Sequence, residues 1–214
     1  VLARLIHGAR VELLVALGAT CLAMVIGGTL GLLGGYLGGV AEMVSMRLVD
    51  VIQSFPPFIV ALLFITIYGP GQLTLIVLLG VMLSPAFARL VYGQTLTVKR
   101  VEYVQAAVAF GANLPTRLFQ VVLPNVAVPI IVQFPITMAV AILTESGLSY
   151  LGIGIVPPTP SWGGMVASGQ RFVSQDPWLI VIPGIAVVVT VLAFGLLGNA
   201  LQYWLDVRAA GDLR

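Results

Sequence analysis

The residue types that perform covalent or metal chemistry are scarce in this sequence. Its single histidine, His7, and its single cysteine, Cys21, provide neither a disulfide nor a Cys-based metal site within the chain. An H-E-x-x-H motif and a glycine-rich loop ending in G-K-[ST] are both missing. We therefore expect no catalytic residue, no metal site and no bound nucleotide, and we expect Cys21, inside an apolar run, to be buried.

Ionisable groups are also few within the apolar stretches. Asp50 follows Arg47 by three residues, a spacing that permits an ion pair within one helix. Glu145 ends an apolar run, where an interfacial anchor is favoured over a contact with substrate. Secondary transporters and channels use ionisable groups in the membrane, so such a protein is the less favoured alternative. An intramembrane enzyme is disfavoured because a nucleophile with a base is missing.

The composition indicates a membrane protein. Apolar residues make up 59% of the 214 residues and charged residues 8%, whereas soluble domains carry about 25% charged residues. A membrane-spanning helix needs roughly 20 mostly apolar residues. Continuous runs meet this length at 13–37, 44–68, 73–90, 126–145 and 177–203. Because they do not alternate as barrel strands do, we predict an all-α polytopic membrane helical bundle with about five spans.

Positive charge orients the predicted spans. Lys and Arg gather on the cytoplasmic side of membrane proteins. One side carries Arg47, Arg89, Lys99, Arg100, Arg117, Arg208 and Arg214, and the other carries Arg4, Arg10 and Arg171. We therefore predict that the C-terminus and the segment 89–125 are cytoplasmic. The run 13–37 exceeds the about 7 to 15 apolar residues of a signal peptide and is a retained span. No basic face interleaved with aromatics suggests a nucleic-acid partner.

Glycine and proline recur inside the predicted spans. Gly27, Gly31, Gly35 and Gly39 stand four residues apart, and small residues on one helix face favour a packing seam over a pore lining. Proline removes a backbone donor, so we expect kinks at Pro56, Pro57, Pro85, Pro129 and Pro135.

The two long connections differ in composition. Segment 89–125 is polar, and its part 101–110 contains good helix formers, which predicts a short surface helix. Segment 146–176 is rich in Gly, Pro and Ser, with Trp162 and Trp178 suited to the membrane interface, and predicts an irregular outer loop.

From Glu102 the sequence reads EYVQAAVAFGANLPTRLFQVVLPNV. This stretch resembles the cytoplasmic signature of binding-protein-dependent ABC importer permeases: an acidic residue, two alanines, a glycine four residues later and a distant Leu-Pro pair. The matching positions are Gln105, Ala106, Ala107, Gly111, Val121, Leu123 and Pro124. The family usually has an acidic residue at the position of Gln105 and often a basic one at that of Val108. We consider Glu102, one helical turn earlier, a substitute for the missing charge.

The resemblance extends along essentially the whole chain. The segments RLVDVIQSFP, YGPG, ARLVYGQTL and SGLSYLGIGIVPPTPSWGGM are similar to the dipeptide, oligopeptide and nickel branch, and to the C-type partner of its permease pair. The resemblance implies the type I importer permease core, with residues 1–214 forming one transmembrane domain. One further helix precedes this segment in that branch, and we expect it to be absent here.

The resemblance also implies a function and partners. It implies a permease subunit that imports short peptides across a bacterial or archaeal cytoplasmic membrane by alternating access, with nickel or another small solute as the alternative cargo. A second permease, two ATPase subunits and an extracytoplasmic binding protein would complete the transporter. The ATPases would use ATP and Mg²⁺, and this chain would bind no cofactor. The implied ATPase-coupling residues are Glu102, Gln105, Ala106, Ala107, Gly111, Leu123 and Pro124, and the implied binding-protein contacts are Pro157, Pro158 and Trp162.

The signature residues also suit a docking element on physical grounds. Ala106 and Ala107 keep the helix narrow enough for a cleft in a partner. Gly111 permits a positive φ at the helix end, which turns the chain sharply. Pro124 is expected to stop any further helical turn before the next span begins.

Overall fold

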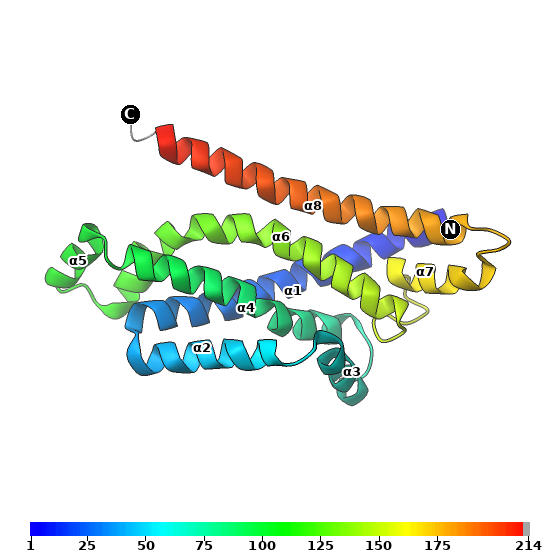
Figure 1. Ribbon diagram of the computed structural model, residues 1–214, viewed down its shortest axis with the longest axis horizontal. Coiled ribbons are helices and arrows are strands. Elements are labelled where there is room, and N and C mark those ends of the chain that lie inside the picture. The colour runs from blue at the N-terminus through cyan, green and yellow to red at the C-terminus, as the bar shows by residue number, and fades with distance from the viewer. Residues whose placement is uncertain (212–214) are drawn as a thin grey trace.

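The computed structural model describes the backbone of residues 1–211 and the side chains of residues 1–205. Four long helices run along its long axis (Figure 1): α1 (Leu2–Leu37), α4 (Gln72–Val98), α6 (Leu123–Tyr150) and α8 (Trp178–Gly211). Each contains a stretch long and apolar enough to cross a membrane. No strand occurs in residues 1–211, so the predicted all-α membrane bundle is confirmed. Arg214 of the charge count lies outside the described residues.

The second predicted span is broken. Helices α2 (Gly39–Ser54) and α3 (Pro57–Tyr68) meet at an angle of 89°. Pro56 precedes α3 in an extended conformation, and a proline can neither donate to the preceding turn nor allow helical geometry at the residue before it. The prediction of a kink at Pro56 and Pro57 is confirmed, but 44–68 is not one straight helix. The bundle has up to five spans if the bent pair counts as one. By contrast, α4 and α6 continue through Pro85, Pro129 and Pro135.

Three glycines bring α1 and α4 into backbone contact. A side chain at Gly27 would collide with the carbonyl oxygen of Ser84, and one at Gly31 with that of Ala88. A Cβ at Gly35 would lie 2.8 Å from the Cβ of Thr95. The predicted packing seam is therefore confirmed for these three positions.

The seam ends before Gly39, and it does not include Cys21. Gly39 begins α2 with a φ of 55°, and a Cβ there would meet nothing within 4 Å. Cys21 is exposed, so the expectation of a buried thiol is wrong. The reason is helical geometry, because the buried face of α1 runs through Ala16, Ala19 and Ala23 and Cys21 lies on another face.

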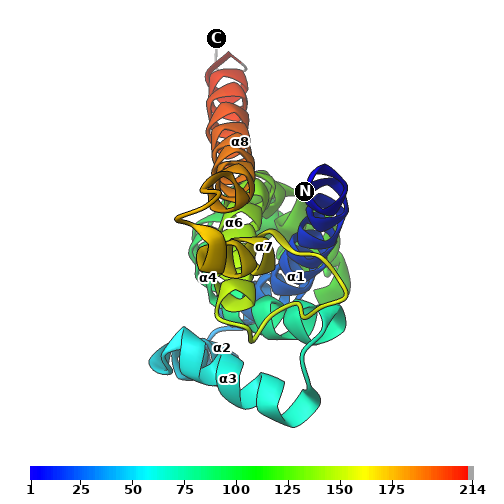
Figure 2. The same cartoon turned by 90° about the vertical axis from the view of Figure 1, so that its right-hand side faces the viewer.

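Short elements occupy the two ends of the bundle (Figure 1): α5 (Glu102–Ala109) at one end and α7 (Trp162–Gly169) at the other. The chain starts at the α7 end, and α8 runs back toward the α5 end. Seen from the α7 end (Figure 2), α7 lies in front of α6 and α1, whereas α8 and the pair α2 and α3 stand out on opposite sides.

Both connections are shorter than predicted. Helix α4 continues to Val98 and a π-helix, η1 (Thr116–Val122), leads into α6, so the connection predicted to be cytoplasmic is 99–115 and not 89–125. On the other side α6 continues to Tyr150, and α7 with the short 3-10 helix η2 (Gln170–Phe172) replaces much of the irregular loop predicted at 146–176.

Candidate functional site

Helix α5 is the short surface helix predicted from the signature, and it stands at the edge of the fold. Val104 is its one buried residue, 2% exposed. Its side chain joins an apolar cluster formed by the bundle residues Leu32, Val91, Leu118, Val122 and Val126. A single buried side chain therefore anchors this helix to the bundle.

The end of α5 is a Schellman motif centred on Gly111. The N–H of Ala112 donates to the carbonyl of Ala107 at 3.0 Å, and the N–H of Gly111 donates to that of Val108 at 3.0 Å. Gly111 has a φ of 76°, which is the left-handed conformation that the motif requires at this position. The conformation predicted for Gly111 is thus present, and it turns the chain back toward η1.

The other signature residues lie around this helix in different environments. Glu102, Gln105 and Ala106 are exposed, and Ala107 is half-buried. The Gln105 side-chain amide donates to the carbonyl of Arg100 at 3.2 Å, so it is occupied locally. Glu102 lies in the first turn of α5, where a negative charge suits the helix dipole.

Leu123 and Pro124 lie apart from α5, at the first turn of α6. Leu123 packs against the same apolar cluster as Val104, and Pro124 is exposed. The expectation that Pro124 stops a helix is wrong, because residues 116–150 form one helical run. A proline is tolerated there because it lies at the junction where π-helical hydrogen bonding gives way to α-helical, in the first turn of α6.

Phe110, which the sequence reasoning did not select, is the most exposed large apolar side chain of the described residues, at 92%. It follows α5 directly and precedes the turn at Gly111. A large aromatic side chain held in solvent by a rigid turn is typical of a contact with a partner protein. The sequence feature that could have identified Phe110 is its position directly before Gly111 of the signature.

At the opposite end, α7 is tied to the bundle by buried polar contacts. Glu12 of α1 accepts from the backbone N–H of Trp162 at 3.0 Å and from the hydroxyl of Ser146 at 3.3 Å. Glu145 of α6 accepts from the hydroxyl of Ser149. Both carboxyl groups are fully buried and face each other. We call Glu12, Glu145, Ser146 and Ser149 the carboxyl network.

The carboxyl network corrects the interpretation of Glu145 as an interfacial anchor. The side chain is 0% exposed because α6 continues beyond it and α7 covers it. Glu12 was not selected from the sequence, since its partners lie more than 130 positions away. The Ser149 hydroxyl also accepts from the N–H of Ile155 at 2.8 Å and so holds the chain that leads away from α6.

Trp162 is buried and not available at the interface, contrary to prediction. Its side chain is 4% exposed, and its indole N–H donates to the carbonyl of Leu5 at 3.0 Å. The next residue, Gly163, lies so close to α6 that a Cβ would collide with the carbonyl of Ser146. A direct contact between Trp162 and a binding protein is therefore excluded in this conformation.

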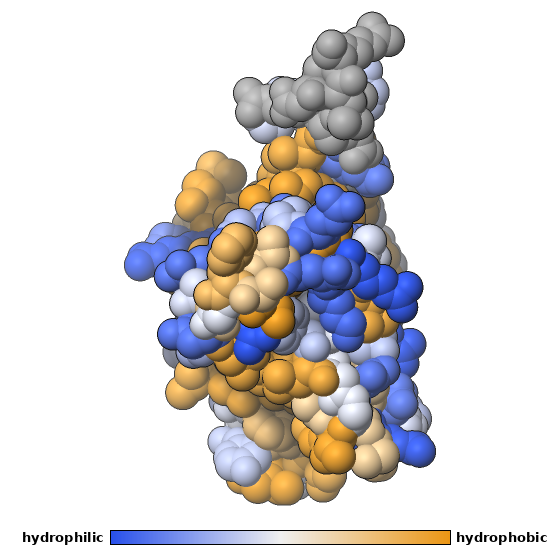
Figure 3. Space-filling view, turned by 90° about the vertical axis from the view of Figure 1, so that its left-hand side faces the viewer, coloured by the Kyte–Doolittle hydropathy of each residue, from blue (hydrophilic) through white to orange (hydrophobic). Residues whose placement is uncertain are grey.

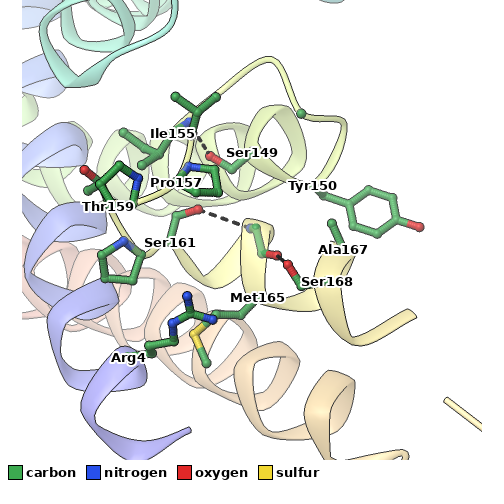
Figure 4. Close-up of a pocket in the computed structure, with 15 residues that line it drawn as sticks. Arg4, Ser149, Tyr150, Ile155, Pro157, Thr159, Ser161, Met165, Ala167 and Ser168 are labelled. Carbon is green, nitrogen blue, oxygen red and sulfur yellow. Dashed lines mark hydrogen bonds between the residues drawn. The ribbon is translucent and has the colours of Figure 1, made fainter. Parts of the chain in front are cut away.

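The segment 155–161 and α7 enclose a pocket of about 260 Å³ on this side of the molecule (Figure 4). Its wall includes Pro157 and Pro158, which are exposed, and Arg4 reaches it from α1. The Ser161 hydroxyl accepts from the N–H of Gly164 and caps α7. The two prolines predicted as contacts thus lie at the surface, whereas Trp162 is buried.

Asp50 does not pair with Arg47 as the spacing permits. It pairs with Arg89 of α4 at 3.1 Å, and both side chains are 57% exposed.

Within residues 1–205, no group of three or more His, Cys, Asp or Glu side chains is arranged to hold a metal ion.

Residues 27–211 match the family described as the inner membrane component of binding-protein-dependent transport systems. The chain belongs to this family. Two bacterial permeases illustrate the similarity. The glutathione transport system permease protein GsiD of Pectobacterium atrosepticum is 38% identical over 97% of this chain and 69% of its own length. The di/tripeptide transport system permease protein DppC of Pseudomonas aeruginosa is 36% identical over 97% and 68%.

The solved structures similar to this permease share its fold. The inward-facing methionine ABC transporter MetNI has a TM-score of 0.75 at 18% identity, over 94% of this chain and 96% of that one. An amino acid ABC transporter structure has a TM-score of 0.70 at 16% identity, over 94% of both chains. The permease therefore has the predicted type I importer fold.

Proposed function

We propose that this permease moves short peptides through the membrane as a subunit of an ATP-driven importer. The relatives named for glutathione and for di- and tripeptides support this cargo. Nickel chelates remain the alternative within the same branch. The ATPase resides in separate subunits, which use ATP and Mg²⁺, and this chain binds no cofactor.

Helix α5 is the proposed coupling element. The observation that carries this proposal is its isolation: one buried side chain holds it, while Gln105, Ala106 and Phe110 are exposed. In our proposal this surface enters a groove of an ATPase subunit, with Glu102 supplying the negative charge that Gln105 lacks. The turn at Gly111 then transmits movement to η1 and α6, where Leu123 and Pro124 begin the span.

The orientation follows from the same assignment. With α5 in the cytoplasm of a bacterium or archaeon, the far end of α8 is cytoplasmic and α7 faces outward. An extracytoplasmic binding protein then meets Pro157 and Pro158, and Trp162 holds α7, which lines the same pocket, against α1. A second, related permease and two ATPase subunits complete the assembly, and the peptide path runs between the two permeases.

Sidedness is tested by thiol labelling. Ala106→Cys and Pro158→Cys are made in a Cys21→Ser background and treated with a membrane-impermeant maleimide in right-side-out and inverted vesicles. We expect Ala106→Cys to react in inverted vesicles alone and Pro158→Cys in right-side-out vesicles alone. Reaction of Ala106→Cys from the outside would refute docking to a cytoplasmic ATPase.

Cargo is tested by uptake. The permease is reconstituted with its genomic-neighbour subunits and binding protein, and uptake of a labelled dipeptide, glutathione and a nickel chelate is compared with and without ATP. We expect ATP-dependent uptake of the peptides. Uptake of nickel alone would support the alternative cargo, and uptake without ATP would support a secondary transporter or channel.

A further inference from the structure

A second pocket lies at the root of α5, where several elements converge. It has a volume of about 430 Å³ and lies between the end of α1, the connection after α4, α5 and the start of η1. Lys99, Arg100 and Arg117 all line it, and the neutral Gln105 lies where the family has an acidic residue. Figure 3, which faces the α5 end, shows hydrophilic side chains gathered there among apolar ones.

The three cations in this pocket have no anionic partner among the side chains that the structure describes. None of them lies within 4.0 Å of a carboxylate among residues 1–205. The Arg117 guanidinium lies over the ring of Tyr36, 5.7 Å from its centroid, and its buried Nε–H has no hydrogen-bond acceptor within the described part of the chain. A buried guanidinium N–H without an acceptor is costly, and an anion in the pocket would satisfy it.

Lys99 is positioned by the end of α1. Its Nζ donates to the carbonyl of Gly35 at 2.8 Å, in the last turn of that helix. This contact uses one of the three N–H donors of the ammonium group and leaves two for a ligand. The charge is therefore held at the pocket wall by the backbone and not by a carboxylate.

The donor set matches a phosphate group. Lys99 and Arg100 are neighbours directly after α4, whereas Arg117 belongs to η1, so cationic donors line the pocket from two parts of the chain. A phosphate oxyanion offers acceptor oxygens in several directions, and arginine and lysine are its usual protein partners. A single carboxylate offers two oxygens in one plane and fills this arrangement less well.

With α5 in the cytoplasm, as proposed above, this pocket would lie near the membrane surface, at the depth of lipid headgroups. Helix α1 ends at Leu37, α4 ends at Val98 and the helical run into α6 starts at Thr116, so the ends of three stretches that could cross a membrane come together here. Leu37 and Phe119 expose apolar side chains at these helix ends, 49% and 60%. Basic pockets between helices on the cytoplasmic side are typical sites for anionic lipid headgroups.

We propose that this pocket binds a phosphate group, carried by an anionic phospholipid or free in solution, and that the bound group links α5 to the end of α1. The phosphate would join Arg117 of η1 and Lys99 beside α1 across the base of α5. Coupling between the ATPase and the membrane helices would then depend on the anionic lipid content.

The test measures lipid retention by the full permease, purified with the subunits that accompany it and stripped of lipid by detergent. Native mass spectrometry records binding of phosphatidylglycerol and phosphatidylcholine with identical acyl chains. We expect a preference for phosphatidylglycerol of about tenfold that falls to near unity in Arg117→Gln and returns in Arg117→Lys. Arg47→Gln, an exposed cation outside the pocket, is the matched control and should keep the preference.

Millimolar inorganic phosphate distinguishes the two sources. If phosphate displaces the lipid or binds without it in an Arg117-dependent manner, the pocket takes free phosphate, and if the lipid alone binds, the headgroup is the ligand. Equal binding of both lipids with no effect of phosphate would overturn the proposal, as would equal losses in Arg47→Gln and Arg117→Gln. Loss of the ATPase subunits from Arg117→Gln with unchanged lipid and phosphate binding would also overturn it and assign the pocket to the protein interface.

Discussion

Helices α5 and α7 have the same length, eight residues each, and lie at opposite ends of one bundle, yet they are attached in different ways. Helix α5 is held by the side chain of Val104 and a turn at Gly111. Helix α7 has a fully buried carboxyl group at its first N–H, a buried tryptophan and a glycine in contact with α6. The comparison shows that α5 is loosely attached and largely exposed, whereas α7 is fixed to the membrane-spanning helices. Substitutions at both ends test this contrast, and they are ordered by decreasing expected effect on stability.

The largest effect is expected at the carboxyl network. Glu12→Ala removes the acceptor of the Trp162 N–H and of the Ser146 hydroxyl in the protein interior, which should cost about 3 kcal/mol of stability. Glu12→Gln keeps an acceptor oxygen and should cost about 1 kcal/mol. Thermal unfolding of the detergent-solubilised protein measures both. Equal unfolding midpoints for Glu12→Ala and the wild type would mean that α7 is not fixed by this contact.

The next effect concerns the close approach of α7 to α6. Gly163→Ala places a methyl group against the carbonyl of Ser146 and should cost about 1–3 kcal/mol, because the backbone of α6 must move. Gly147→Ala is the matched control on α6, since a Cβ there meets nothing within 4 Å. It should be neutral or stabilising by up to about 1 kcal/mol. The same unfolding assay applies, and indistinguishable variants would contradict the predicted contact.

At the other end, Gly111→Val should alter function more than stability. A β-branched residue at a φ of 76° is strained by about 1–2 kcal/mol, and the strain is confined to the end of α5. We expect normal insertion and the loss of ATP-dependent uptake in reconstituted vesicles. Gly111→Asn tolerates the left-handed conformation and should retain most uptake. Normal uptake by Gly111→Val would argue against coupling through this turn.

The mildest change in stability is expected at Phe110. Its side chain is 92% exposed, so Phe110→Ser should change stability by less than about 0.5 kcal/mol. If α5 docks into an ATPase, the same substitution should weaken copurification of the ATPase subunits, because exposed aromatics often carry interface affinity. Phe119 is also an exposed aromatic residue, so Phe119→Ser is the control for losing an exposed apolar side chain elsewhere on the surface. Unchanged copurification in Phe110→Ser would remove this residue from the docking surface.

The sequence predicted local features well. The left-handed conformation of Gly111, the seam through Gly27, Gly31 and Gly35, and the break at Pro56 follow from the backbone preferences of glycine and proline. The turn and the break depend on neighbours within one or two helical turns, and the glycine spacing shows which face of α1 another helix can approach, although not which helix does so. They can therefore be inferred without knowing how the helices assemble.

Long-range contacts could not be predicted in the same way. Glu12 accepts a hydrogen bond from the backbone N–H of Trp162, 150 positions later in the sequence, and no residue near Glu12 indicates this contact. Trp162 was assigned to the membrane interface because aromatic residues beside a polar loop usually lie there, but the carbonyl of Leu5 satisfies its indole inside the fold. The stop predicted at Pro124 was wrong because the π-helix before it accommodates a missing donor. Whether the signature residues contact an ATPase stays a prediction.

The glycine seam between α1 and α4 has a mechanical consequence. Where one backbone rests on the carbonyl groups of another with no side chain between them, rolling of either helix would bring a larger side chain into the seam. We therefore expect the two helices to move together as a rigid pair in a transport cycle. Conformational changes would then occur in the elements around this pair, among them α8, whose membrane-crossing stretch is only 11% buried.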